Sequence, residues 1–294
     1  MTVPKSQHVI SKLVLKRFGE NRNGDVRVAT FNKEHRHTRF RSVASVGYVE
    51  HFINHDPSAS ENAWGVIETQ AARALDRIDA DPSETAGGAI GDDRDRDALK
   101  RLVALHFLRR QATRNVFDLS YARRRKERLE EVSADPLRLN PIAERLIGHR
   151  PRSRSEFDYV LRRFGEHLDK AQERIFQDLL MDMVRRSAAD LDQLELQIWR
   201  AGEYEFMIGD EGVVSLDADG QLADAQLLGN FVHLLPVGRK LLLGISSAPD
   251  IITLSGPGVR RINAFELHGA ERFAYFHPHS GLQTFCDEET DPTV

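Results

Sequence analysis

The sequence is poor in cysteine and in long apolar runs, and both shortages exclude classes of protein. Its 294 residues contain one cysteine, Cys286, so neither an internal disulfide nor a cysteine-based zinc site can form. The nearest candidate for a membrane span, 231–245, is short and interrupted by charged residues. Lysines and arginines also interrupt the N-terminus, where a signal peptide needs an apolar core. These features favour the reducing cytoplasm.

Signatures of nucleotide binding and covalent catalysis are lacking as well. The glycine pairs at 87–88 and 256–258 match neither a Walker loop nor a dinucleotide fingerprint. The sequence has no Gly-x-Ser-x-Gly nucleophile elbow. Cys286 lies in an acidic tail, which raises the pKa of its thiol and weakens it as a nucleophile. We therefore expect no ATP, no NAD and no covalent intermediate.

Charge is abundant but unevenly distributed. The composition, 40% hydrophobic and 29% charged, is that of a globular protein with a net charge of −4. Residues 1–41 carry 10 basic and 3 acidic side chains and residues 94–163 carry 19 and 10, whereas residues 42–93 carry 2 and 10 and residues 164–294 carry 10 and 22. Two basic segments in an otherwise acidic chain predict RNA or another polyanion as partner. The alternative is that these charges form solvated helix faces that pair with one another.

The hydrophobic periodicity changes along the chain from helical to alternating. Helical spacing predicts helices over 11–18, 61–78, 95–131, 155–189 and 260–270, with a proline-containing loop near Pro136, Pro141 and Pro151 and another loop over 81–93. Alternation predicts strands over 26–31, 194–198, 204–208, 213–216, 231–235, 241–245 and 273–276. We expect an α+β fold in which a helical N-terminal half packs against a mainly antiparallel sheet from the C-terminal half. One domain, 1–294, would comprise a helical part (about 1–190), a sheet-forming part (about 191–280) and an acidic tail (287–294).

Several polar residues occupy positions where a buried helix normally carries apolar groups. His8 precedes the first predicted helix, and Glu68 lies at the edge of the apolar stripe of the second. His106 and Arg110 lie one turn apart within the stripe of the long predicted helix 95–131. Polar groups in such places need partners, so these residues are candidates for a shared site.

Several short motifs are spread over the chain. They are Gln7-His8 followed by Leu13 and Phe18, the acidic pair Glu61 and Glu68, Arg110, the turn Gly209-Asp210-Glu211-Gly212, Asn263, and Ala270-Glu271-Arg272. Together they resemble the bacterial family catalogued as domain of unknown function 4238, over nearly the whole chain. That family usually has proline where this chain has Ser11, and Ser-Asp-Asn-Pro where it has Gly-Asp-Glu-Gly. The resemblance implies one domain and little about its biochemistry.

A histidine, carboxylates and an arginine at one site suit attack on an ester or a phosphodiester. We assign His8 as base, Arg110 as anion clamp, and Glu68 and Asp210 as orienting groups. Phosphate contacts are expected from Lys12, Lys16, Arg17, His106, Arg109 and Arg114. The alternatives are structural: a buried polar network, a hydrogen-bonded core histidine at His106, and a turn residue at Asp210.

Metal binding is the weaker hypothesis. The histidine pairs 35/37, 51/55 and 277/279 lack a recognisable ligand context. A magnesium ion held by Glu61, Glu68 and Asp210 is conceivable, because Mg²⁺ needs few protein oxygens. We otherwise expect no metal and no organic cofactor.

Two functional hypotheses result. In the first, the protein is a cytoplasmic hydrolase acting on RNA, at a tRNA-linked ester or a phosphodiester. In the second, it is a non-catalytic module that binds nucleic acid or an acidic protein surface. Neither hypothesis involves a membrane.

Overall fold

The computed structural model describes residues 6–80, 92–223, 231–246 and 254–291. The helices are α1 (Lys12–Arg17), α2 (Pro57–Ala80), α3 (Asp93–Leu108), α4 (Gln111–Ala134), α5 (Pro136–Ile147), α6 (Arg154–Leu191), α7 (Gly256–Gly269) and α8 (Leu282–Glu289). The strands are β1 (Ser6–His8), β2 (Glu20–Arg22), β3 (Asp25–Asn32), β4 (His37–Ser42), β5 (Tyr48–Glu50), β6 (Glu195–Arg200), β7 (Ile208–Gly209), β8 (Val214–Leu216), β9 (Val232–Gly238), β10 (Leu241–Ser246) and β11 (Phe273–Phe276). The predicted α+β class is confirmed.

The strands form antiparallel sheets that join distant parts of the sequence. One sheet has the order β6-β10-β9-β8 and comes wholly from the C-terminal part. A second has the order β2-β3-β11-β7, with β4 also paired to β3. In this sheet C-terminal β11 pairs with N-terminal β3, so that Phe273 lies opposite Asn32. The first 50 residues therefore supply more strands than the predicted one at 26–31.

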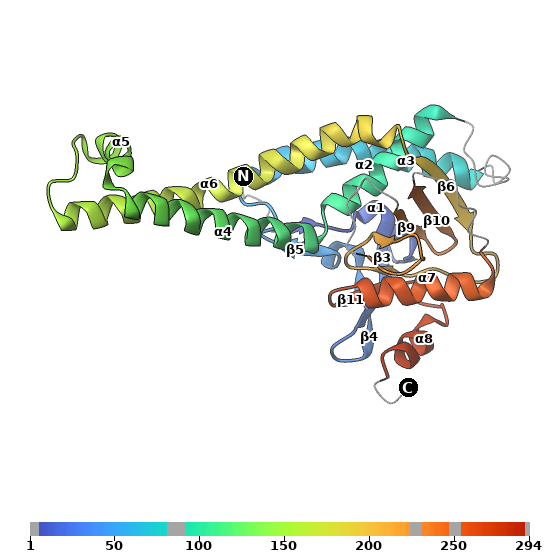
Figure 1. Cartoon of the computed structure of the whole chain (residues 1–294). Coiled ribbons are helices and arrows are strands. Elements are labelled where there is room, and N and C mark those ends of the chain that lie inside the picture. Colours follow the sequence, from blue (N-terminus) through green and yellow to red (C-terminus); the bar gives the residue numbers. More distant parts are fainter. Residues whose placement is uncertain (1–5, 81–91, 224–230, 247–253, 292–294) are drawn as a thin grey trace.

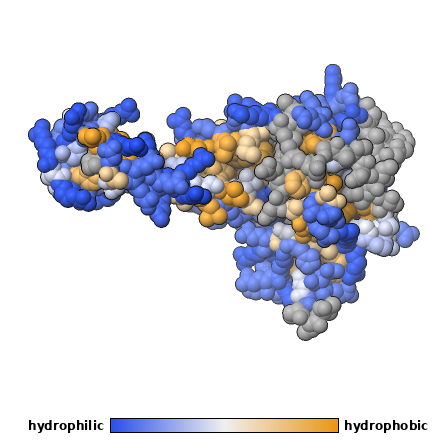
Figure 2. All heavy atoms as spheres, viewed as in Figure 1, coloured by the Kyte–Doolittle hydropathy of each residue, from blue (hydrophilic) through white to orange (hydrophobic). Residues whose placement is uncertain are grey.

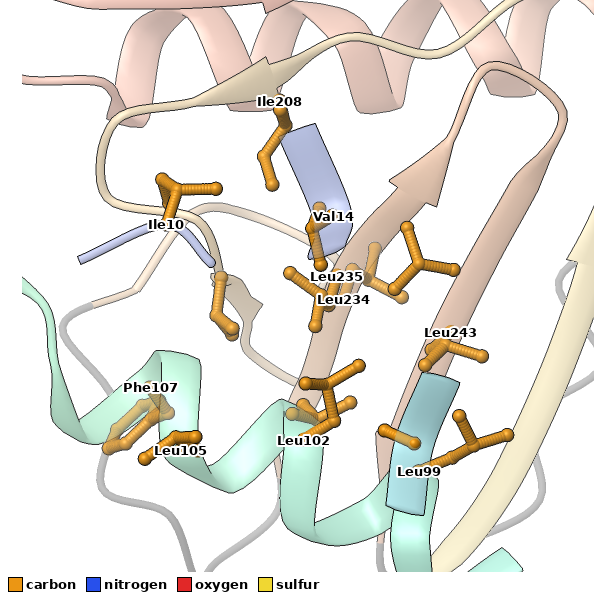
Figure 3. Packing of buried hydrophobic residues seen from close by; sticks show 14 of the residues in the cluster. Ile10, Val14, Leu99, Leu102, Leu105, Phe107, Ile208, Leu234, Leu235 and Leu243 are labelled. Atoms are coloured by element: carbon orange, nitrogen blue, oxygen red, sulfur yellow. The ribbon is translucent and has the colours of Figure 1, made fainter. Parts of the chain in front are cut away.

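Helix α3 packs across the first sheet and forms the centre of the core. Leu99 and Leu102 of α3 face Leu234 and Leu243 of β9 and β10, with Val14 of α1 close by (Figure 3). All five side chains are fully buried. Burying several such residues stabilises the fold by about 2 kcal/mol each. This core holds the N-terminal segment and α3 in a constant relative position.

Helices α4 and α6 run side by side away from the body as an arm, with α5 at its far end (Figure 1). The far end has its own small apolar cluster, formed by Val132, Leu139, Ala143 and Val160. The large cluster of the body, in contrast, draws on residues from Val9 to Tyr275. Organisation as a single domain stays a prediction.

Two expectations about helix boundaries were wrong. The helix expected over 95–131 is two helices, because the backbone of Arg110 is extended (φ −63°, ψ 146°) between α3 and α4. The predicted loop at Pro136 and Pro141 is helix α5, because Pro136 stands in its first turn, where its missing N–H costs nothing. Asp135 caps this helix through Leu137 N–H, and Gly148, at φ 78°, ends it. The loop predicted over 81–93 lies mostly outside the described residues, as do residues 292–294 of the acidic tail.

Candidate active site

The break between α3 and α4 decides which of two adjacent arginines is buried. Arg109 ends α3, and its N–H donates to the carbonyl of Leu105. Its side chain is 1% exposed. Arg110, on the extended residue, instead donates from Nε to the carbonyl of Phe107, and its guanidinium carbon lies 4.0 Å from the Phe107 ring centroid. The clamp position inside the molecule therefore belongs to Arg109.

Arg109 is held by an ion pair and an aromatic face. Its Nη1 donates to Oε1 of Glu68 at 2.9 Å, and its Cζ lies 5.0 Å from the ring of Trp64. Both partners come from α2, one turn apart, so a single helix face positions them. Burial lowers the pKa of Arg109, which the charges of Glu68 and Glu61 counteract. The guanidinium remains charged, since its pKa starts far above neutrality.

His106 lies beneath Arg109 and is neutral. Its Nδ1 donates to the carbonyl of Leu102 at 2.9 Å, and its Nε2 accepts the N–H of Ser11 at 3.2 Å. A carbonyl only accepts and an amide N–H only donates, so the tautomer is settled. Burial and the charge of Arg109 lower the pKa of His106 to about 3. Ser11 makes this contact where the resembled family has proline, which lacks the N–H. Both ring nitrogens of His106 are therefore hydrogen-bonded to the backbone, as expected of a core histidine.

His8 has a different environment from His106. Its ring contacts Tyr48 edge-on, at 6.1 Å between centroids. Burial, then the charges of Lys12 and Arg109, lower the pKa of His8 to about 4, so the ring is neutral at pH 7. Its Nε2 is buried, and within the described residues it meets no hydrogen-bond partner. A neutral imidazole with an unused nitrogen has the state that a general base requires.

The Arg109 cluster comprises His8, Lys12, Glu61, Trp64, Glu68 and Arg109. Burial raises the pKa of Glu61, the charges of Arg109 and Lys12 lower it, and Glu68 raises it again. Besides His8 Nε2, the buried Nε1 of Trp64 and Nε of Arg109 are without partners among the described residues. Such unsatisfied donors in a native fold point to a bound anion or to water. The cluster therefore combines donors for an anion with two groups able to exchange protons.

Arg110 belongs to another environment, beside Glu211. The Glu211 carboxylate accepts the N–H of Ala112 at 3.3 Å, at the start of α4. Burial nevertheless raises the pKa of Glu211 to about 7, against the opposing effects of Ala112 and Arg110. Glu211 was not predicted as a site residue. It directly follows Asp210 in the Gly-Asp-Glu-Gly turn, so an acidic residue at a strand end was the available signal.

Asp210 is engaged by the backbone. Its Oδ1 accepts the N–H of Glu271 at 2.7 Å, and its Oδ2 accepts the N–H groups of Arg272 and Phe273, both at 2.9 Å. Its own N–H donates to the carbonyl of Phe273. We call this arrangement the Asp210 clasp. It ties the turn after β7 to the start of β11, which matches the structural alternative and leaves these oxygens occupied by N–H donors.

A groove of about 560 Å³ lies between the two environments. Its lining includes Asp210, Glu211 and Glu271 on one side and Tyr48 on the other. Tyr48 also contacts His8, so the groove adjoins the Arg109 cluster at this residue. The structure thus brings His8 and Glu68 together around Arg109 and places Arg110 and Asp210 at the acidic turn.

Of the other residues expected to contact phosphate, two are exposed to solvent and two already bind acceptors within the protein. Lys12 and Lys16 are exposed, one turn apart on α1. Arg17 is engaged by both oxygens of Asp79 and by the carbonyl of Val237. Arg114 is buried and donates to Glu173, Asp118 and the carbonyl of Phe52. Arg17 and Arg114 therefore hold elements of the fold together, because their guanidinium groups point at protein acceptors.

Metal ligands do not gather in the described part of the chain. No group of three His, Cys, Asp or Glu side chains there is arranged to hold an ion. The rings of His35 and His37 stack, and those of His277 and His279 lie 5.7 Å apart, without a third ligand. In the magnesium set of the sequence analysis, Asp210 is held by the clasp and away from Glu61 and Glu68, which lie at Arg109. Cys286 is buried in α8, where burial and then its acidic neighbours raise its pKa to about 12.

The pairing of Arg109 with Glu68 was hidden at the sequence level by the helix break. A continuous helix places Arg110 on the line of His106, whereas the break directs Arg110 onto Phe107 and leaves Arg109, at the end of α3, as the buried arginine. Glu61 was considered only as a metal ligand. Its spacing of seven residues from Glu68 on one helix face was the signal for a common site.

Comparison with known proteins agrees with the resemblance. The profile of the family described as Protein of unknown function (DUF4238) matches residues 6–280. The match covers most of the chain, which therefore belongs to this family. Searches of curated proteins and of solved structures found no match. Among the described residues, no helix has the length and apolar character needed to span a membrane.

Proposed function

We propose that this DUF4238 protein is a hydrolase acting on RNA, and that the Arg109 cluster is its active site. The observation that carries the proposal is the convergence of His8, Glu61 and Glu68 on Arg109, with three ring or guanidinium nitrogens without partners. Arginine and lysine next to a proton acceptor are what phosphodiester cleavage in RNA requires. The exposed lysines of α1 supply the approach for a polyanion.

The roles follow from protonation states. His8, neutral at pH 7 because its pKa is about 4, accepts the proton of the attacking hydroxyl. Glu61, whose pKa is raised by burial, is the carboxyl group assigned to proton transfer at the leaving oxygen. The exposed Lys12 holds the non-bridging phosphate oxygens, the buried Arg109 adds its positive charge from within the protein, and Glu68 orients Arg109. Two groups with pKa values shifted in opposite directions form the usual acid–base arrangement.

The charge of the arm contributes less than the sequence indicated. Most of its basic side chains pair within the arm, for example Arg123 with Glu127 and Arg125 with Asp169. Such exposed pairs are worth little energetically, but they reduce the field that a polyanion meets. We therefore restrict the proposed phosphate contacts to the Arg109 cluster and the neighbouring Lys16.

The test is an RNA cleavage assay with purified protein and total cellular RNA that includes aminoacylated and peptidyl-tRNA. We expect cleavage in EDTA as in magnesium, and its loss in His8→Ala and in Glu61→Gln. His55→Ala is the matched control, because His55 is exposed and outside the cluster. Unchanged RNA and unchanged acyl linkages in the wild-type reaction would refute the proposal, as would full activity of His8→Ala.

A non-catalytic binding module is the second candidate, and one observation favours it. The arm carries an apolar groove with exposed side chains, which is a feature of proteins that dock partners. Salt-sensitive RNA binding that survives His8→Ala, without turnover by wild type, would favour this candidate. Binding that persists in His8→Ala while turnover is lost would favour the hydrolase.

A further inference from the structure

The arm carries an apolar groove between α4 and α6 that is separate from the Arg109 cluster. Its volume is about 730 Å³. Phe176 and Leu180 are buried and form its floor, and Phe117 lies against Phe176 with 4.9 Å between ring centroids. Figure 2 shows the corresponding hydrophobic patch on the arm near the body. Two packed helices normally bury such a surface against a third element.

The rim of the groove is apolar and open to solvent. Val116 on α4 is 65% exposed, and Ile175 and Leu179 on α6 are each 45% exposed. Ile175, Leu179 and Met183 follow one another at four-residue intervals, so they line one side of α6. A continuous apolar rim of this kind is typical of a docking surface rather than of scattered surface residues.

The charges of the lining have a single sign. The groove is lined by Arg124, Arg125 and Arg128 at the end that points away from the body, and by no acidic residue. Arg125 pairs with Asp169 and Arg128 with Glu131, so Arg124 is the lining arginine whose charge a partner covering the floor must meet. The charge complement is therefore acidic, at one end of an otherwise apolar surface.

The dimensions suit one helix. On each wall the lining runs over 16 residues, Thr113 to Arg128 and Leu168 to Met183, which corresponds to about 24 Å of helix. A single helix of about four turns laid in this groove completes a three-helix bundle.

A second copy of the chain fits the charges less well. In an antiparallel pairing of two arms, the arginines of one copy meet the body end of α6 in the other. The carboxylates there are already paired, Asp178 with Arg174 and Asp182 with Arg186. Arg124 would then compete for carboxylates that already have partners.

We propose that the α4/α6 groove binds an amphipathic helix of a partner protein, with acidic residues at the end that lies over Arg124. The apolar face of the helix covers Ile175, Leu179 and Val116, and its carboxylates pair with Arg124. Met183 adapts to the anchor side chain, since methionine is flexible. The binding surface is distinct from the Arg109 cluster and does not depend on catalysis.

The probe is a fluorescein-labelled amphipathic peptide of about 18 residues. It carries leucine at three- and four-residue intervals, glutamate in its first turn and glutamine elsewhere. We expect saturable binding by fluorescence anisotropy, weakened by salt. A peptide with lysine in place of glutamate, and one with its leucines out of helical register, are expected to bind at least about tenfold more weakly.

Variants of the protein distinguish the groove from the rest of the arm. Ile175→Glu/Leu179→Glu should weaken binding by at least about tenfold, and Arg124→Glu should weaken it by roughly threefold to tenfold. The matched controls are Leu119→Glu and Arg123→Glu, because these residues are exposed on the same helix outside the groove lining. Both controls should bind as wild type does. Circular dichroism checks that every variant keeps its helices.

Three results would overturn the proposal. They are the absence of saturable binding by the acidic peptide, equal losses in Leu119→Glu and Ile175→Glu/Leu179→Glu, and dimerisation in sedimentation velocity that the groove variant abolishes. The last result would assign the groove to a second copy of the chain. Because the peptide assay involves no RNA, its outcome is independent of the cleavage assay.

Discussion

The Asp210 clasp and the Arg109 cluster both place ionisable side chains inside the protein, but they differ in what those side chains contact. Asp210 faces three backbone N–H groups, which use its carboxylate oxygens. In the Arg109 cluster, by contrast, His8, Trp64 and Arg109 each retain a buried nitrogen without a partner among the described residues.

The difference indicates which of two polar networks is structural and which is a site. When backbone N–H groups satisfy the hydrogen bonds of a buried carboxylate, they rigidify the fold and leave that carboxylate little capacity to bind a ligand. Unsatisfied donors near a proton acceptor cost stability and persist where they serve binding or catalysis. We therefore expect changes in the clasp to reduce stability, and changes in the cluster to reduce ligand binding with smaller effects on stability.

The largest stability effect is expected from Asp210→Ala. The change leaves three N–H groups of residues 271–273 without their acceptor, which should lower the free energy of unfolding by about 2–4 kcal/mol. Asp210→Asn keeps one acceptor oxygen and should cost roughly half as much. Urea denaturation followed by circular dichroism measures both. A loss below about 0.5 kcal/mol in Asp210→Ala would contradict the structural role of the clasp.

The next effect concerns Glu211, whose pKa rises from 4.5 to about 7 in the folded protein. The unfolded chain releases this proton at lower pH than the folded protein does. Stability contributed by the protonated form is therefore complete below about pH 4.5 and is lost as the pH rises through about 7, by about 3 kcal/mol. In Glu211→Gln this pH dependence should disappear. Glu34→Gln should retain it, because Glu34 is an exposed residue that lines the same 560 Å³ groove as Glu211. Urea denaturation at several pH values provides the comparison.

Within the Arg109 cluster, Glu68→Gln and Glu61→Gln should differ. Glu68 pairs directly with Arg109, and its side chain is 25% exposed, so its loss should cost about 1–2 kcal/mol by leaving the arginine less compensated. Burial disfavours the charged form of Glu61, so a neutral glutamine should cost less than about 0.5 kcal/mol. Urea denaturation at pH 7 distinguishes the two. Equal losses would show that Glu61 and Glu68 support Arg109 alike.

The sharpest test of the site concerns His8. Its pKa of about 4 is below the ordinary 6.5, so its contribution to stability is present above about pH 6.5 and declines as the pH falls toward 4. NMR titration of its imidazole should show a midpoint near 4. Inorganic phosphate should raise that midpoint, because a bound anion favours the imidazolium. If phosphate moves His55 as much as His8, the cluster has no specific anion site.

Much of the architecture was predictable because it depends on local patterns. The period of the apolar residues identified α1, α2, α6 and α7. Local capping also fixes the start of α1, where the Oγ of Ser11 accepts the N–H of Val14. The alternating segments after residue 190 became antiparallel strands, except that the strand predicted over 204–208 is reduced to the two-residue β7. Helix α5 was not predicted, because two prolines close together usually indicate a loop. The first of them, however, stands in the opening turn of the helix, where proline is favourable.

The candidate site was predictable by residue type and less so by position. A histidine, carboxylates and an arginine were expected together, and His8 and Glu68 do lie around a buried arginine. The arginine is Arg109, because α3 ends there and the extended backbone of Arg110 takes the next side chain off the buried face. Periodicity averages over several turns and therefore cannot register a break of a single residue.

The amino-acid sequence was sufficient for the α+β class, for most helices and strands, for family membership and for the kinds of residue at the candidate site. These follow from periodicity, capping and composition, which act over a few neighbouring residues. The tertiary structure alone decided that Asp210 is engaged by residues 271–273, that Arg109 rather than Arg110 meets Glu68, and that the arm exposes an apolar groove. Those outcomes depend on contacts between segments far apart in the chain, whose geometry is set by packing and burial rather than by local sequence.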